Sequence, residues 1–432
     1  MKKSSYRWSV IAIATIITTA CVARQSKADA YDDMWTECNY ITQCSATSAN
    51  ASCASLANTK PMYGILNDWR IGNGQADFVK PGEAAMGSIG LLYGYHRLQV
   101  AGRSNSSLDT RAKTALSGFF WSWVRNTNNM VGSGFPQTIN YTSAGDISSK
   151  DSAANAGVTA ELLIAMRKYC LYSPNGDGAS YQSQEYSLAH SMADYVNANL
   201  STWTIDRSYA VAAFRAFGNW ASAVGDSGTS SYYINQANTV SGWLAGAQDP
   251  GGWHNYYSYL DGAGHGVYNN NIVDQTGFAP YEFNARPLGE AYAKGVADWW
   301  NTGSSFNNVT LTQQSGAYIG GVHQETDKSA LYAGSALQLA DAEWKIAGQT
   351  GNYNNLYASA WSHYNFARSG STLWNTSGSQ DCNGIAGGFV DWIEPSTGAK
   401  PTDCFKRFVD TSAYFLIATE ELQFSNQVDF SN

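Results

Sequence analysis

Glu83 is a candidate proton donor because of its place in the chain. It lies in the segment PGEAAMG (residues 81–87), directly before an apolar run over residues 89–95. Negative charge at the start of a helix is favoured by the macrodipole, so Glu83 could be an ordinary helix-start residue. A carboxyl in a partly dry pocket has a raised pKa and can donate a proton near neutral pH. Both interpretations are open for this residue taken alone.

A second carboxylate is expected where the chain enters another helix. Glu282 and Arg286 stand just ahead of Pro287, which suits the first position of a helix. Inverting hydrolysis of a glycosidic bond needs a protonated carboxyl and an ionised carboxylate about 6.5–9.5 Å apart. Glu83 would be the acid, and Arg286 could hold a carboxylate ionised or bind a substrate group. The candidates for the base, in order of preference, are Glu282, Asp274 and Asp151.

The loop that precedes this helix is dense in residues that bind sugars. Aromatic side chains with polar tips offer flat platforms for sugar rings, and amides and imidazoles can bond the hydroxyls. The alternative is a structured loop whose Gly and Asn residues satisfy their own backbone. With two candidates from other segments, the substrate-binding candidates are Asn155, Trp253, His254, His265, Tyr268 and Tyr281.

The composition favours a carbohydrate partner and disfavours a polyanionic one. Charged residues make up 14% of the 432 residues, whereas an average globular protein has roughly 25%. The chain holds 15 Trp and 27 Tyr, and its formal net charge is -8. An acidic protein is a poor partner for nucleic acid or an anionic membrane, which recruit basic patches. We therefore expect a polysaccharide substrate and neither of these two partners.

The N-terminus is typical of a secretory signal peptide. Three basic residues within the first seven are followed by an apolar stretch over residues 10–22 and by the sequence ADA at residues 28–30. We expect cleavage after Ala30 and export of residues 31–432, to the extracellular space or to a periplasm, with no membrane attachment afterwards. Residues 31–60 form a cysteine-bearing arm of the single domain that follows.

An even number of cysteines in an exported chain indicates disulfide bonds. We expect Cys382 to pair with Cys404, and two of the three N-terminal cysteines to pair, which leaves the third for Cys170. The six cysteines of the exported chain are Cys38, Cys44, Cys53, Cys170, Cys382 and Cys404. Their spacing is not that of a zinc site, so no metal or other cofactor is expected.

The elements that must position these residues are helices. Apolar residues recur at three-to-four spacing in ten segments, separated by loops rich in Gly, Ser, Asn, Asp and Tyr. The segments are 84–100, 111–125, 154–170, 187–198, 210–224, 232–247, 287–300, 328–347, 353–367 and 411–423. This rhythm predicts an all-α (α/α)6-type toroid with long loops at one end, where functional residues gather on a rigid scaffold. The alternative is a helical bundle or solenoid without a cleft.

Five segments, in this order, resemble a distant version of glycoside hydrolase family 8. They are 83–87, 119–125, 146–165, 207–217 and 281–287. The family opens with Glu-Gly-x-x-Tyr-Gly-Met, which carries its general acid, and Glu83 takes that place here without the Tyr. Asn155 stands about where the family has an Asp. Glu282 or Asn284 lies near the Asp of its Asp-x-x-Arg-x-Pro-x-Arg segment, which carries the base, and Arg286 matches the first Arg.

This resemblance implies a secreted, inverting endo-hydrolase of β-1,4-linked chains on an (α/α)6 barrel, with Glu83 as the acid. We expect a monomer. Two other classes stay open. A toroid-shaped polysaccharide lyase would abstract a proton next to a uronate carboxyl, with Tyr292 or a His as base and with Arg286 or Asn155 as neutraliser. A non-catalytic carbohydrate-binding protein could use the same scaffold.

Overall fold

Each of the ten segments with helical periodicity is helical in the computed structural model. The structure describes residues 27–43, 56–66, 77–142, 144–249, 255–268, 277–301, 305–306, 309–323, 330–350, 354–376, 386–390, 392–401 and 409–432. Within these ranges lie 13 α-helices and a few short strands. The prediction of an all-α architecture is therefore confirmed.

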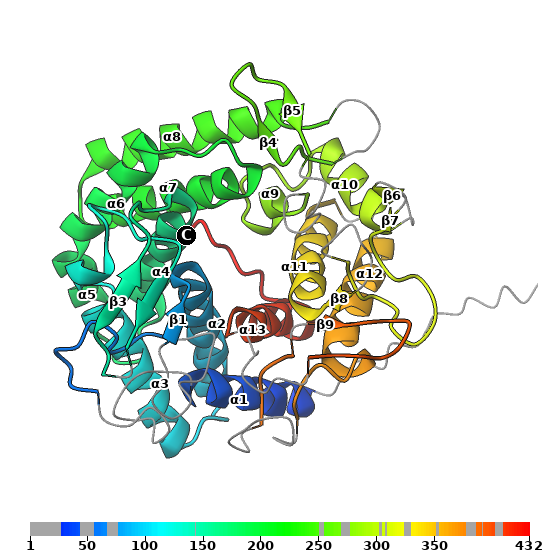
Figure 1. Cartoon of the computed structure of the whole chain (residues 1–432), viewed down its shortest axis with the longest axis horizontal. Helices are drawn as coiled ribbons and strands as arrows, with labels where there is room; N and C mark the ends of the chain where they lie inside the picture. Colours follow the sequence, from blue (N-terminus) through cyan, green and yellow to red (C-terminus); the bar gives the residue numbers. More distant parts are fainter. Residues whose placement is uncertain are drawn as a thin grey trace, which may run out of the picture.

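Six of the helices form a closed inner ring. In order around the ring they are α2 (Pro81–Val100), α4 (Ala156–Tyr172), α7 (Thr204–Ala223), α9 (Ala279–Glu282), α11 (Ala333–Thr350) and α13 (Val409–Phe424). Each packs against the next, and α13 packs back against α2. Figure 1 looks down the axis of this ring. One inner position is filled by the four-residue α9, so the ring is irregular at that point.

The remaining helices lie outside this ring (Figure 1). They are α1 (Lys27–Gln43), α3 (Ser106–Gly118), α5 (Gly178–Gln184), α6 (Tyr186–Ala198), α8 (Ser227–Gly246), α10 (Ala291–Asn301) and α12 (Asn354–Asn365). Helix α8 packs on α7, α12 on α11, and α1 on both α2 and α13. Two layers of helices around one axis make the predicted (α/α)6-type toroid.

Burial explains which helices are inside. Helix α13 is buried from Thr411 to Leu422 on every side, as expected for a helix with neighbours all round. Helix α10 is amphipathic and buries mainly Ala293, Val296, Ala297, Trp299 and Trp300, so it presents a single face to the core. Apolar content all round a helix thus marks the inner layer, and a one-sided stripe marks the outer layer.

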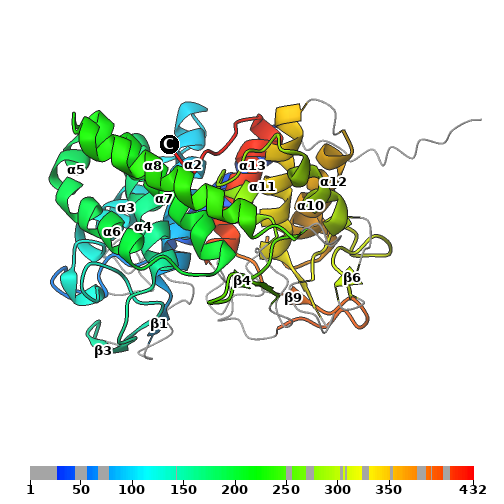
Figure 2. The ribbon, with the colours of Figure 1, turned by 90° about the horizontal axis from the view of Figure 1, so that it is seen from above.

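The short strands gather at one end of the toroid (Figure 2). Strands β1 (Asp77–Val79), β2 (Ile139–Tyr141) and β3 (Ile147–Lys150) form an antiparallel sheet. The two-stranded pairs are β4 (Tyr259–Leu260) with β5 (Gly266–Val267), β6 (Ser305–Phe306) with β7 (Val309–Thr310), and β8 (Leu331–Tyr332) with β9 (Trp392–Ile393). Strand β1 leads into α2 and β8 leads into α11, so this end is where inner helices begin.

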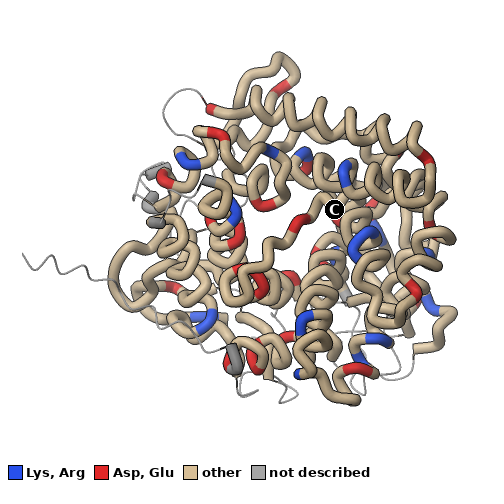
Figure 3. The backbone as a smooth tube through the Cα atoms, turned by 180° about the vertical axis from the view of Figure 1, so that it is seen from behind, with Lys and Arg blue, Asp and Glu red and all other residues tan. Residues whose placement is uncertain are grey.

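The C-terminal segment closes the opposite end of the ring. Figure 3 shows it lying across the ring, with charged residues on the helices around it. The Lys168 ammonium donates to the carbonyl oxygen of Asn432 at 2.7 Å, and the Asn219 amide donates to that of Ser431 at 3.1 Å. Phe430 is fully buried. Access to the interior is therefore from the end that carries the strands.

Three features of the N-terminal region and the cysteines differ from expectation or stay open. Residues 31–43 are helical as part of α1, which spans the predicted cleavage point after Ala30; the cleavage itself stays a prediction. Cys38 and Cys170 are free thiols, so the expected disulfide to Cys170 is wrong. The predicted Cys382–Cys404 pair lies outside the described residues. None of the described helices is long and apolar enough to cross a membrane.

Candidate active site

A cavity of about 370 Å³ lies where four inner helices begin. Its walls come from the first turns of α2, α4, α7 and α13, from the residues just ahead of them and from the loop after α3. The lining residues are Lys80, Gly82, Glu83, Met86, Gln137, Asn155, Val158, Glu161, Ile205, Asp206, Tyr209, Asp410 and Tyr414. This is a volume suited to a small-molecule or sugar site.

Four carboxyl groups meet in this cavity, one from each helix. They are Glu83 of α2, Glu161 of α4, Asp206 of α7 and Asp410 of α13. Helix N-termini carry partial positive charge, which offsets part of the repulsion between the four acids. A cluster of carboxyls in a partly dry space separates their protonation states, because all of them cannot ionise together.

Lys80 is the cation that faces this cluster. Its ammonium lies 2.5 Å from Oε1 of Glu83 in an ion pair, and it opposes the rise in the pKa of Asp410. Oε2 of Glu83 is buried and has no hydrogen-bond partner among the described residues. Glu83 is therefore paired with Lys80 through one carboxyl oxygen, and its other oxygen has no hydrogen-bond partner among the described residues.

The environment of Glu161 favours the protonated form of its carboxyl. Burial raises the pKa of its carboxyl from 4.5 to about 8, with further contributions from the negative charges of Asp206 and Asp410. A hydrogen bond from Tyr209 opposes this rise. With a pKa of about 8, Glu161 is largely protonated at neutral pH. It is a carboxylic acid that can give a proton to a bound group.

Asp206 and Asp410 lie near the starts of α7 and α13. Burial raises the pKa of both carboxyls above the usual value, and the Thr411 amide lowers that of Asp410. Asp206 lies against Gly157, where an added Cβ atom would stand 2.4 Å from its Oδ1 atom. Only glycine at this position of α4 leaves room for the carboxylate.

Asn155 is brought into the same cavity, as the substrate-binding prediction required. It is the N-cap of α4, and its side-chain oxygen accepts from the Val158 amide at 3.0 Å. The capping bond fixes the amide at the rim of the cavity, beside Asp206. Glu83 and Asn155 are the two predicted site residues that line this cavity.

Glu282, the preferred base, lies elsewhere. Its side chain in α9 is fully buried and does not line the cavity, and its two carboxyl oxygens have no hydrogen-bond partner in the described part of the chain. Burial, with the charge of Asp341, raises the pKa of Glu282 well above its ordinary value. The Lys345 ammonium donates to the Glu282 carbonyl oxygen at 2.6 Å and to Asp341 Oδ2 at 2.8 Å. Glu282 thus belongs to the toroid interior, where the charge of Glu161 also contributes to the raised pKa of its carboxyl.

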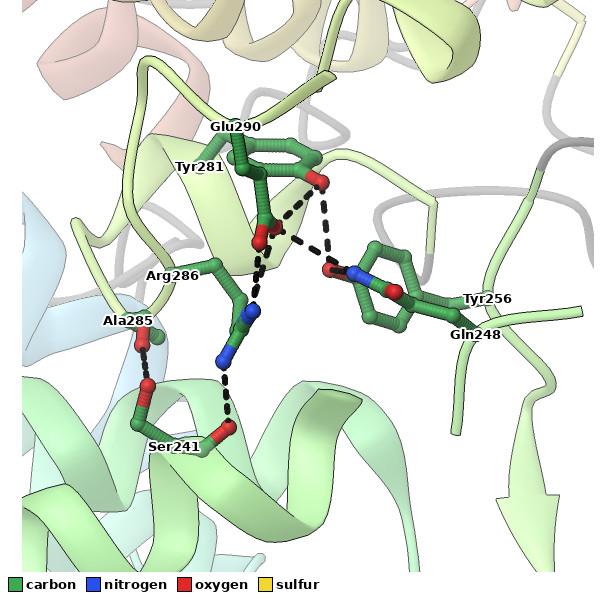
Figure 4. Close-up of polar contacts among 7 residues, drawn as sticks. All are labelled: Ser241, Gln248, Tyr256, Tyr281, Ala285, Arg286 and Glu290. Carbon is green, nitrogen blue, oxygen red and sulfur yellow. Dashed lines mark hydrogen bonds and ion pairs between the residues drawn. The ribbon is translucent and has the colours of Figure 1, made fainter. Parts of the chain in front are cut away.

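Arg286 is committed to a structural network (Figure 4). Its guanidinium forms an ion pair with Glu290 and donates to the Ser241 carbonyl oxygen at 2.9 Å. The hydroxyl of Tyr281 donates to Glu290 Oε1 at 2.9 Å and lies 3.1 Å from the hydroxyl of Tyr256. This network ties the segment after α9 to α8, so Arg286 and Tyr281 are placed to hold the fold.

Tyr292 and Tyr268 both contact Asp249. The Tyr292 hydroxyl donates to the carbonyl oxygens of Asp249 and Asn255, at 3.1 and 2.6 Å. The Tyr268 hydroxyl donates to Asp249 Oδ2 at 2.7 Å. His265 is exposed in the β4–β5 hairpin, 3.3 Å from Asp261 Oδ2. The structure places none of these three in the acidic cavity.

Four predicted site residues remain. Trp253, His254 and Asp274 lie outside the described residues. Asp151 is exposed, and its carboxylate accepts from the Thr138 amide at 2.8 Å. Among the described residues, no group of three His, Cys, Asp or Glu side chains is arranged to hold a metal ion.

Sequence reasoning missed Glu161, Asp206 and Asp410 as site residues. Each stands near the start of a helix in which most residues are buried. An acid near the start of a largely apolar helical segment was the signal that could have found them. It is the same signal that singled out Glu83.

The ring of inner helices, the outer layer and the cavity at the helix starts define an (α/α)6 toroid of the kind found in carbohydrate-active enzymes. No family model matches the chain, and no curated protein matches it by sequence. Solved structures share the fold at low identity. The glucoamylase of Hormoconis resinae has a TM-score of 0.61 at 10% identity, over 93% of this chain and 74% of that chain.

Two further structures are similar over nearly their whole lengths. The cellulase Cel9M of C. cellulolyticum has a TM-score of 0.58 at 11% identity, over 92% of this chain and 99% of that chain. A sugar epimerase from a ruminal bacterium has a TM-score of 0.55 at 12% identity, over 90% of this chain and 98% of that chain. The likeness confirms the toroid and the distant resemblance to this fold group.

Proposed function

We propose that this chain is a carbohydrate-active enzyme that hydrolyses glycosidic bonds in the acidic cavity. The observation that carries the proposal is the convergence of Glu83, Glu161, Asp206 and Asp410 from the first turns of four inner helices. Glycoside hydrolysis needs two carboxyl groups in opposite protonation states. The cavity offers this pair in Glu161 and Glu83.

We assign Glu161 as the proton donor and Glu83 as the ionised partner. Glu161 holds its proton at neutral pH because burial and two neighbouring acids raise its pKa to about 8. Glu83 is paired with Lys80 and presents its second oxygen without a partner among the described residues. The donor role that the sequence suggested for Glu83 thus passes to Glu161, and the base role passes from Glu282 to Glu83.

The reaction follows from these states. Glu161 protonates the glycosidic oxygen as the bond to the leaving sugar breaks, and Glu83 takes a proton from the water that attacks the anomeric carbon. Asp206 and Asp410 keep Glu161 protonated between turnovers. The distant family resemblance supports inversion, internal cleavage and β-1,4-linked chains as the finer form of the proposal. Export and a monomeric state also belong to it.

Similar folds give this proposal its context. The structures similar to this one include a glycosidase, glucoamylases, an endoglucanase and a cellulase. They also include a sugar epimerase and a D-mannose isomerase. The lyase alternative has less support, because Tyr292 is bonded to two carbonyl oxygens and Arg286 is paired with Glu290.

The first test is a substrate screen with two readouts. The purified protein is incubated with β-glucan, xylan and chitosan beside alginate, pectate and glucuronan. New reducing ends report hydrolysis, and new ultraviolet absorbance reports the unsaturated product of a lyase. We expect reducing ends without absorbance. Absorbance together with inactive Tyr292→Phe would establish the lyase instead.

The second test separates the two glutamates. Glu161→Gln and Glu83→Gln should each lower kcat on the natural polysaccharide by about 10²–10⁴-fold. An aryl glycoside with a good leaving group needs no proton donor, so Glu161→Gln should keep most of its activity on it, whereas Glu83→Gln should not. Asp151→Asn, an exposed acid outside the cavity, is the matched control. Near wild-type turnover by both Gln variants would overturn the proposal.

A further inference from the structure

A second hollow lies next to the acidic cavity. It has a volume of about 620 Å³ and runs over the starts of α4 and α7 and the end of α6. It shares four lining residues with the acidic cavity: Gln137, Asn155, Ile205 and Asp206. The second hollow is a groove that therefore lies beside the acidic cavity and its carboxyl cluster.

An exposed tryptophan lines this groove. Trp203, just ahead of α7, is 39% exposed and is the only exposed tryptophan in the part of the chain that the structure describes. Leaving a large aromatic ring in water forgoes the stabilisation that burial would bring, so an exposed ring beside a groove indicates a ligand. Tyr195 and Asn199 line the groove with it.

The ring of Trp203 is held in place by its neighbours. The backbones of Trp203 and Tyr259 pair as an antiparallel bridge, and their ring centroids lie 4.9 Å apart. Next along the chain, the Thr204 amide donates to the Ser258 carbonyl oxygen at 2.9 Å. A flat ring fixed by a hairpin can accept a sugar ring with little loss of side-chain entropy.

The groove is poor in charge. Its lining contains the carboxyl of Asp206 and no Lys or Arg among the described residues. The amides of Gln137, Asn155 and Asn199 can exchange hydrogen bonds with sugar hydroxyls. No Lys or Arg lines the groove to pair with the carboxylate of a uronate, which Asp206 would repel. This chemistry suits a neutral sugar.

We propose that this groove binds the neutral sugars next to the bond that is cleaved, with one sugar ring stacked on Trp203. The substrate is then a chain of neutral sugars that extends beyond the carboxyl cluster on the side of α6 and α7. The inference rests on the proposed function, because the carboxyl cluster marks the point of cleavage. It adds the substrate class and a binding residue that no sequence pattern had singled out.

Binding and hydrolysis are measured separately to test it. Cello- and xylo-oligosaccharides of two to six sugars, and oligogalacturonates of the same lengths, are titrated into the inactive Glu161→Gln protein by calorimetry. Affinity for one neutral series should rise with length until the groove is filled, and oligogalacturonates should bind at least tenfold more weakly. Equal or tighter binding of oligogalacturonates would overturn the assignment to neutral sugars.

Substitutions of the platform complete the test. Trp203→Ala should weaken binding of the longer oligosaccharides by roughly fivefold and leave the shortest bound ligand unaffected. Trp203→Tyr should restore most of the affinity. Tyr232→Ala on α8, which removes another exposed ring, is the control. Unchanged affinity in Trp203→Ala would overturn the platform, whereas oligosaccharide binding without hydrolysis by the wild type would refute the proposed function alone.

Discussion

Glu161 of α4 lies against Gly82 in the first turn of α2. A Cβ atom at position 82 would stand 2.2 Å from Oε2 of Glu161, closer than any real contact allows. The carboxyl therefore occupies the space that a side chain on the neighbouring helix would fill. The placement of the proposed proton donor depends on a residue that carries no functional group of its own.

Replacing Gly82 by Ala should disable the site without unfolding the protein. The atom in the way is the far end of a flexible side chain, so Glu161 can swing aside while the helices stay packed. A displacement of about 1 Å can cost on the order of 10²-fold in rate. We expect kcat of Gly82→Ala to fall by about that factor, measured on the polysaccharide found in the screen, with the midpoint of thermal unfolding nearly unchanged.

The control for this substitution is Gly242→Ala. Gly242 lies within α8 and has open space where a Cβ atom would be. Alanine there should raise the free energy of unfolding by about 0.5–1 kcal/mol and leave activity alone. If Gly82→Ala were as active as Gly242→Ala, the Glu161 carboxyl would not need its present position.

The pH dependence of kcat tests the state of Glu161. A proton donor works while it is protonated, so kcat should fall as pH rises through about 8, the pKa that burial and two acids give this carboxyl. Asp206→Asn removes a negative charge that favours the protonated form. The descending limb should then move to lower pH, as seen in rate profiles measured from pH 5 to 10.

Asp151→Asn provides the matched charge change outside the cavity. It should leave the descending limb where the wild type has it. A limb that stays in place in Asp206→Asn, or a wild-type rate that does not fall above pH 8, would exclude Glu161 as the donor.

The helices were predictable because apolar periodicity is local. The segment 411–423 proved to be part of α13, and 84–100 part of α2. The site was harder to predict from the sequence, because it depends on which helix starts meet when the ring closes. Glu83 and Asn155 were found from their own segments. Glu161 was passed over because it sits inside the apolar run of α4, and only the contact between α2 and α4 reveals its place.

The burial of Glu282 has a physical origin. The sequence predicts a helix from Pro287, with Glu282 in a loop ahead of it, whereas the chain forms the short α9 at 279–282 and α10 only from Ala291. Helix α9 completes the inner ring, and this buries Glu282 among residues of α11 such as Asp341 and Lys345. The packing of the inner ring thus determined the structure of this segment, against the local sequence pattern.

Glu37 should make the stability of the protein depend on pH. It is buried in α1, where the Trp374 ring nitrogen donates to its Oε1 atom at 2.5 Å and the Gly388 amide donates at 3.0 Å. Burial raises the pKa of Glu37 from 4.5 to about 7 against the opposing effect of these bonds. The folded protein therefore holds a proton that the unfolded chain releases, and stability is lost as pH rises from about 4.5 through 7.

Glu37→Gln removes this titration. Between pH 4.5 and pH 8, the free energy of unfolding of the variant relative to wild type should shift in favour of the variant by about 3 kcal/mol. Urea denaturation at the two pH values measures the difference, and other buried carboxyls cancel because both proteins contain them. Glu394→Gln, a partly exposed acid bonded to Ser396 and Thr397, should show no such shift. An equal response of both variants would mean that Glu37 is already ionised in the fold at low pH, so that α1 contributes no pH-dependent stability to the toroid.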